Sequence, residues 1–125
     1  TKLPIIKISF PAKAKASTEG DIHNQFKHMR GYYIDIGYRF NDYRSFMRII
    51  GNGINDKDGQ YVFFVNHDRQ WAVHNMNAID KKWHGWFITN ETAQSEAPEY
   101  KTFTWRYWNS KESKFNHWSG NPVQI

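Results

Sequence analysis

Residues 102–120 combine three tryptophans with side chains that form directional hydrogen bonds. The stretch is TFTWRYWNSKESKFNHWSG. An indole ring can pack on the apolar C–H face of a sugar, while amide, imidazole and guanidinium groups hydrogen-bond its hydroxyls. We therefore predict a lectin-like carbohydrate site without catalysis, in which Trp105 or Trp108 is the stacking ring. The other predicted members are Arg106, Asn116, His117 and Trp118.

A second group with the same mixture of side chains occupies residues 67–71, with the sequence HDRQW. Here we expect Asp68, Arg69 and Trp71 to contribute to ligand binding. Residues 81–87, KKWHGWF, have a similar composition. Burial in the core is the alternative for any single tryptophan. However, the chain has six, and 18% of its residues are aromatic, so some aromatic rings should lie at a recognition surface.

His67 and His74, in the stretch NHDRQWAVH, offer an alternative based on acid–base chemistry. Histidine titrates near neutral pH, so such a pair could serve a small basic hydrolase or ribonuclease. The sequence lacks a nucleophile elbow, a Walker loop and a dinucleotide-binding glycine motif. We therefore expect no enzymatic activity and no cofactor, and we keep the hydrolase as the alternative.

The sequence predicts no metal site. Residues 55–59, NDKDG, begin like a calcium loop, but the bidentate glutamate and flanking helices of an EF-hand are absent, so a hairpin turn is expected. The spacings of His23 with His28 and of His67 with His74 fit neither one helix face nor one strand face. A zinc site would require the fold to bring distant side chains together. The chain has no cysteine, which excludes disulfides and thiolate ligands.

Alternation of apolar and polar residues predicts the elements that must position these side chains. It is seen at residues 6–10, 32–38 and 103–107, and each segment predicts a half-buried strand. QYVFFVN (60–66) is a continuous apolar run typical of a central strand. With short helical turns expected only near 21–29 and 77–83, we predict one all-β domain over residues 1–125, an antiparallel β-sandwich or jelly roll.

The strand expected at 102–108 has two distinct faces. Phe103, Trp105 and Tyr107 point one way, while Arg106 and Trp108 point the other. Only one of these faces needs to be core. The polar turn NSKESK and the return through FNHWSGNP then predict a hairpin that places Asn116, His117 and Trp118 nearby.

Charge favours an anionic partner. Lysine and arginine outnumber aspartate and glutamate by 17 to 12, which gives a formal charge of +5 and a pI near 9.5. Acidic or sulfated glycans fit this balance, and single-stranded nucleic acid, whose bases could stack on the same rings, is the other alternative. A homo-oligomer would gain avidity from several weak sites. No run of eighteen apolar residues is present, so we expect no membrane span.

The segment Tyr32-Tyr33-Ile34-Asp35-Ile36-Gly37, followed by Asn41, Ser45 and Arg48, resembles the signature of the farnesoic acid O-methyltransferase-like domain of invertebrate proteins. FPAKAKASTEGDIH (10–23) and WHGWFI (83–88) are similar to other parts of that family, so the resemblance covers about residues 8–90. It implies a secreted β-sandwich module. The methyltransferase activity is not expected, because no glycine-rich strand-to-helix turn is present to hold a cofactor.

Overall fold

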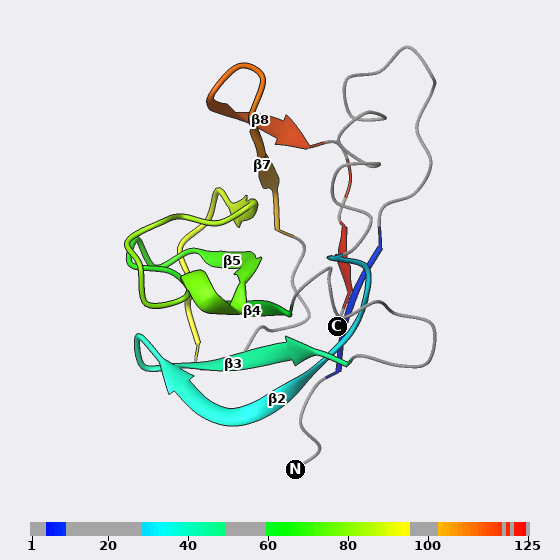
Figure 1. The fold of residues 1–125 in the computed structure, drawn as a ribbon, viewed down its shortest axis with the longest axis vertical. Coiled ribbons are helices and arrows are strands. Elements are labelled where there is room, and N and C mark those ends of the chain that lie inside the picture. The colour runs from blue at the N-terminus through cyan, green and yellow to red at the C-terminus, as the bar shows by residue number, and fades with distance from the viewer. Residues whose placement is uncertain are drawn as a thin grey trace.

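The computed structural model of the protein describes residues 5–9, 29–49, 60–95, 103–118, 120 and 122–124 of the 125-residue chain (Figure 1). These residues form one antiparallel sheet with the strand order β8-β7-β6-β5-β4-β3-β2-β1-β9. A short 3-10 turn, Met76–Ala78, follows β5. The strands are β1 (Ile6–Ile8), β2 (Gly31–Phe40), β3 (Tyr43–Arg48), β4 (Tyr61–Val65), β5 (Trp71–Asn75), β6 (Phe87–Thr89), β7 (Trp105–Asn109), β8 (Lys114–Trp118) and β9 (Val123–Gln124).

The all-β, antiparallel prediction is confirmed, and the described strands belong to one sheet, so a sandwich of two sheets is not shown. The strands expected at 6–10, 32–38, 60–66 and 103–107 all appear, with shifted ends. The calcium-like turn at 55–59, His23, His28 and most of the helical turn at 21–29 lie outside the described residues.

The sheet is a meander that curls back on itself. β1 to β7 each pair with the next strand along the chain, and β9 returns to pair with β1. Only four residues separate Trp118, the end of β8, from Val123, the start of β9. Such a connection spans no more than about 18 Å. The two ends of the strand order must therefore approach each other, and Figure 1 shows the sheet curving from β2 and β3 round to β7 and β8.

The inner face of the curled sheet carries the aromatic core. The Phe63 ring stacks on Trp71 with centroids 5.0 Å apart, and Trp118 packs edge-on against Phe87 and Tyr107. All of these side chains are at most 1% exposed. Successive side chains of a strand point to opposite faces of the sheet, so the residues next to these inward ones in β4 to β8 point to the outer face.

A smaller apolar cluster lies on the outer face of the central strands. It consists of Val62, Phe64, Ala72 and Ile88, with Phe40, Met76, Ile79 and Phe115 packed against it. The central strands are therefore covered on both faces, as the continuous run YVFFV predicted. Met76 and Ile79 belong to the connection between β5 and β6, and residues 82–86 of the same connection line the pocket described next.

Candidate functional site

A pocket of about 350 Å³ opens on the outer side of the sheet. One wall comes from the segment 82–86, which precedes β6. The other wall comes from outward-facing positions of β5, β7 and β8, namely His74, Trp108 and Phe115. Trp108 and Phe115 are directly opposite each other in the β7–β8 ladder. The lining residues are His74, Lys82, Trp83, His84, Gly85, Trp86, Trp108 and Phe115.

Gly85 allows the segment 82–86 to lie directly against β5. Its φ of +126° is a conformation that L side chains rarely adopt, and a Cβ there would lie 3.0 Å from the carbonyl oxygen of Val73. The next residue, Trp86, donates its backbone N–H to that same carbonyl over 2.8 Å and accepts a hydrogen bond from Trp108 N–H, also over 2.8 Å. The segment is thus held between β5 and β7, which fixes this wall of the pocket.

Aromatic rings make most of the pocket surface. His74 is stacked with Trp83 at 5.8 Å and lies edge-on to Trp86 at 5.2 Å, while Trp108 lies edge-on to Phe115 at 5.1 Å. Trp83 is 54% exposed, so it offers ring surface to a ligand.

The charges around the pocket are unevenly distributed. Desolvation by burial lowers the pKa of His74 below its ordinary value, and its Nδ1 accepts the Asn75 N–H over 2.8 Å, as a neutral imidazole does. The Lys82 side chain is exposed among the lining residues, and the Lys81 ammonium lies 4.9 Å from the centroid of the Trp83 ring. The pocket therefore combines a neutral imidazole with basic residues that would favour an anionic group.

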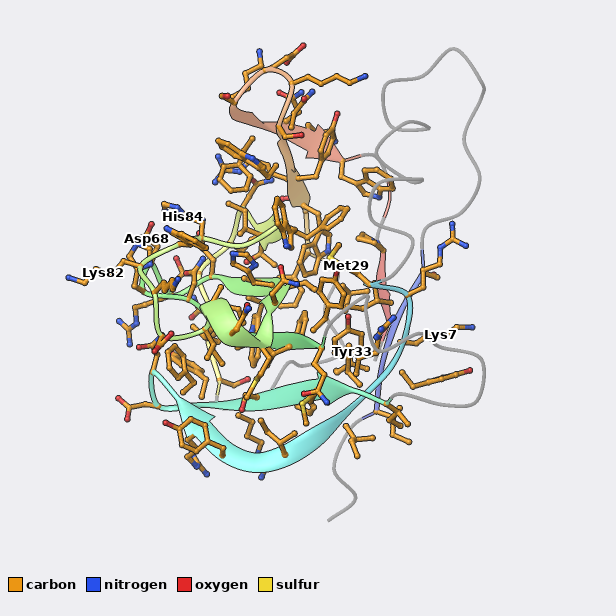
Figure 2. All side chains as sticks on the ribbon, in the orientation of Figure 1. Lys7, Met29, Tyr33, Asp68, Lys82 and His84 are labelled. Carbon is orange, nitrogen blue, oxygen red and sulfur yellow. The ribbon has the colours of Figure 1, made fainter. Side chains whose placement is uncertain are left out.

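A second cluster adjoins the pocket and shares His84 with it. Nε2 of His84 lies 2.5 Å from Oδ2 of Asp68, and Nε2 of His67 lies 3.7 Å from Oδ1 of the same carboxylate. The centroids of the two imidazole rings are 4.8 Å apart. Figure 2 shows Asp68 and His84 side by side, with Lys82 on the same side of the view.

Three of the predicted stacking residues belong to the core instead. Trp71, Trp105 and Trp118 are 1%, 0% and 1% exposed. They occupy inward positions of β5, β7 and β8, where neighbouring aromatic rings cover them. In this structure these three rings offer almost no exposed surface to a ligand, so they do not form part of the pocket.

The remaining residues predicted in the C-terminal stretch are divided between two surroundings. Arg106 and Trp108 share the less buried face of β7, as predicted, but only Trp108 lines the pocket. Arg106 lies opposite the exposed His117 in the β7–β8 ladder, and its guanidinium carbon is 5.7 Å from the centroid of the Phe115 ring. Asn116 donates to the Glu112 carboxylate over 3.2 Å. The hairpin is confirmed, but it does not gather these side chains into one site.

The second predicted group is also divided. Asp68 joins the cluster with His67 and His84, whereas the Arg69 guanidinium donates to the Tyr43 hydroxyl over 3.5 Å. His67 and His74, the alternative acid–base pair, have different surroundings. His67 contacts Asp68 and His84, while His74 packs against the tryptophans of the pocket.

Sequence reasoning missed Trp83, His84, Trp86 and Phe115 as members of one site. The mixed composition of KKWHGWF was a signal for the first three. Phe115 could have been found from the expected hairpin, because a partner strand that faces Trp108 must place one residue beside it. Which tryptophan-rich segment lies over which strand could not be predicted from composition.

Comparison of the chain with protein families, curated proteins and solved structures gives no significant match. Within the residues that the structure describes, no helix is long and apolar enough to cross a membrane.

Proposed function

We propose that the protein binds carbohydrate without chemical conversion, in the pocket between the segment 82–86 and strands β5, β7 and β8. The observation that carries this proposal is the aromatic lining of a 350 Å³ pocket that also contains polar side chains. This volume lies at the lower end of the roughly 300–1,000 Å³ typical of small-molecule sites. It suits one or two rings of a ligand rather than an extended surface.

In this proposal the exposed Trp83 ring and the partly exposed Trp108 ring pack on the C–H faces of the sugar. His84 and Lys82 supply polar groups at the same pocket, and Lys82 favours a sulfate or carboxylate substituent. The basic charge of the chain supports the same preference for acidic or sulfated glycans. Of the residues that the sequence predicted in the C-terminal stretch, only Trp108 lines the proposed pocket. The proposed recognition chemistry is the same as the one expected from the sequence.

Two further expectations accompany the proposal. The resemblance of residues 8–90 to the farnesoic acid O-methyltransferase-like domain suggests a secreted protein, in which an extracellular glycan would be within reach. A homo-oligomer would increase avidity for a repeated glycan. Analytical ultracentrifugation of the purified chain measures its oligomeric state directly.

Titration of the chain with neutral and sulfated oligosaccharides, followed by tryptophan fluorescence and calorimetry, tests the proposal. We expect Trp83→Ala and Trp108→Ala each to weaken binding about fivefold, since a stacking contact contributes on the order of 1 kcal/mol. The matched control is Tyr38→Ala, an aromatic side chain that is 59% exposed on β2 and does not line the pocket.

Absence of binding to every sugar class would refute the proposal, as would equal affinity of the pocket variants and the wild-type chain. Binding of single-stranded oligonucleotides, with tryptophan quenching that tolerates any base and a steep dependence on salt, would favour the nucleic-acid alternative instead. Turnover of a phosphodiester or glycoside with a bell-shaped pH profile would favour the hydrolase.

A further inference from the structure

We propose that His67, Asp68 and His84 form a binding site for one divalent transition-metal ion, with Zn²⁺ as the probe. The three residues each offer one ligand atom, and these atoms all lie within 4.8 Å of one another. Two imidazoles and a carboxylate form a ligand set that suits Zn²⁺ and its neighbours in the first transition series. The sequence spacing did not predict this site, because His84 comes from a different segment than His67 and Asp68.

The loop that carries His67 and Asp68 has a defined backbone, held by the buried side chain of Asn66, which is 1% exposed. Its Oδ1 accepts hydrogen bonds from the backbone N–H groups of Asp68 and Gln70, both over 3.0 Å. The backbone of the loop is closed by Asn66 N–H to Gln70 O at 2.9 Å and by Arg69 N–H to Asn66 O at 3.0 Å. The two ligand residues of this loop are therefore presented on a fixed turn.

The same asparagine ties this turn to the third ligand residue. Nδ2 of Asn66 donates to the backbone carbonyl of His84 over 3.0 Å, and Gly85 packs the chain next to His84 onto β5. The backbones of both ligand segments are thus held together independently of any contact among the three ligand side chains. Such preorganisation distinguishes the cluster from a chance meeting of exposed side chains.

Only side-chain movement is needed to accommodate an ion. Tetrahedral ligands at about 2.1 Å from zinc lie roughly 3.4 Å from one another. To reach this separation, the His84–Asp68 distance of 2.5 Å would widen by about 0.9 Å, and a distance at the 4.8 Å limit of the cluster would narrow by about 1.4 Å. The side chains of His67, Asp68 and His84 are 35%, 51% and 42% exposed, so their rings and carboxylate have room to turn.

Three protein ligands leave at least one position of a four-coordinate ion for water or another ligand. His84 also lines the aromatic pocket, so an ion on its imidazole would lie beside that pocket. The metal proposal does not depend on carbohydrate binding, because it is tested with the metal alone.

Calorimetric titration of the intact chain with Zn²⁺, in a non-chelating buffer, measures affinity and stoichiometry. A parallel titration with Co²⁺ reports coordination through its visible absorption. We expect one high-affinity ion per chain. His67→Ala and His84→Ala should each weaken it more than about 100-fold, since loss of even an indirect partner typically costs about 10–100-fold. His117→Ala, which removes an exposed histidine on β8 outside the cluster, should leave the affinity unchanged.

Circular dichroism establishes that each variant is folded, and His67→Ala is the decisive one because its side chain lies on an exposed turn. The proposal is overturned when the wild-type chain takes up no Zn²⁺ at micromolar concentration. It is equally overturned when folded His67→Ala binds as tightly as the wild-type chain, or when His117→Ala loses as much affinity as the cluster variants. Sugar binding that persists without metal would leave the proposed function standing, so the two proposals fail separately.

Discussion

His74 shows how a single side chain joins the stability of the sheet to the surface of the pocket. It is 6% exposed, lies between Trp83 and Trp86, and accepts a backbone hydrogen bond at Nδ1. Burial lowers its pKa in the folded state, whereas in the unfolded chain the imidazole titrates near its ordinary value of about 6.5. The folded state therefore favours the neutral form of this imidazole.

The free energy of unfolding should consequently fall as the pH drops below about 6.5, where the unfolded chain binds a proton that the folded chain does not. One such proton contributes a slope of up to about 1.4 kcal/mol per pH unit, and the contribution is absent above that range. We expect His74→Gln to flatten the slope, measured by urea unfolding between about pH 5 and 7. His117→Gln, which changes an exposed histidine, is the control, and an identical slope in His74→Gln and the wild-type chain would contradict the argument.

At the scale of elements, the contact of the segment 82–86 with β5 depends on Gly85. A methyl group at this position would meet the Val73 carbonyl oxygen at 3.0 Å and the Ala72 Cβ at 3.1 Å, on a backbone with a φ of +126°. We expect Gly85→Ala to lower the free energy of unfolding by about 2–4 kcal/mol through backbone strain and overpacking. Sugar and Zn²⁺ affinity should both fall, because Trp83, His84 and Trp86 would shift together.

Gly37→Ala is the matched control for this substitution. Gly37 also has a positive φ, of 72°, but no atom lies within 4 Å of an added Cβ. Its replacement should cost about 1 kcal/mol from the left-handed conformation alone and leave ligand binding intact. Denaturant unfolding and titrations with sugar and Zn²⁺ compare the two variants. Equal losses of stability and affinity in Gly85→Ala and Gly37→Ala would show that the steric contact at Gly85 is unimportant.

The strands were predictable because the alternation of apolar and polar residues is a local signal. The same alternation predicted that Trp105 and Tyr107 share one face of β7. Local signals did not reveal which face is inside. In β7 the inward face carries Trp105 and the outward face carries Trp108, and both faces are aromatic, so composition alone favoured neither. The convergence of His67 and His84 is a long-range consequence of Asn66 and Gly85, and sequence spacing contains no record of it.

At the scale of the whole molecule, the curled sheet has an aromatic core on its inner face and the pocket on its outer face. Among the residues that the structure describes, eight aromatic side chains are buried in this core, where their large rings add apolar area to the core of a small protein. Trp83, Trp86, Trp108 and Phe115 line the pocket where the segment 82–86 crosses the outer face, and His84 joins it to the cluster with Asp68. The proposed sugar and metal sites are adjacent because they share His84, while Lys7 lies on the opposite side of the view in Figure 2.

This arrangement predicts that charge acts locally rather than through the total of +5. At physiological ionic strength the Debye length is about 8 Å, so only cations near the pocket should contribute to binding of a sulfated oligosaccharide. We expect its affinity to fall as salt is raised, while the affinity for the neutral analogue changes little. Lys82→Ala should weaken binding of the sulfated form by up to about fivefold, the range of an exposed ion pair, whereas Lys7→Ala should have no effect. Calorimetry at two salt concentrations measures the affinity of the wild-type chain for the sulfated and the neutral oligosaccharide, and that of the two lysine variants for the sulfated form. If Lys7→Ala weakened binding as much as Lys82→Ala did, recognition would depend on the overall charge of the chain, and the pocket would lose its role as the specific anion site.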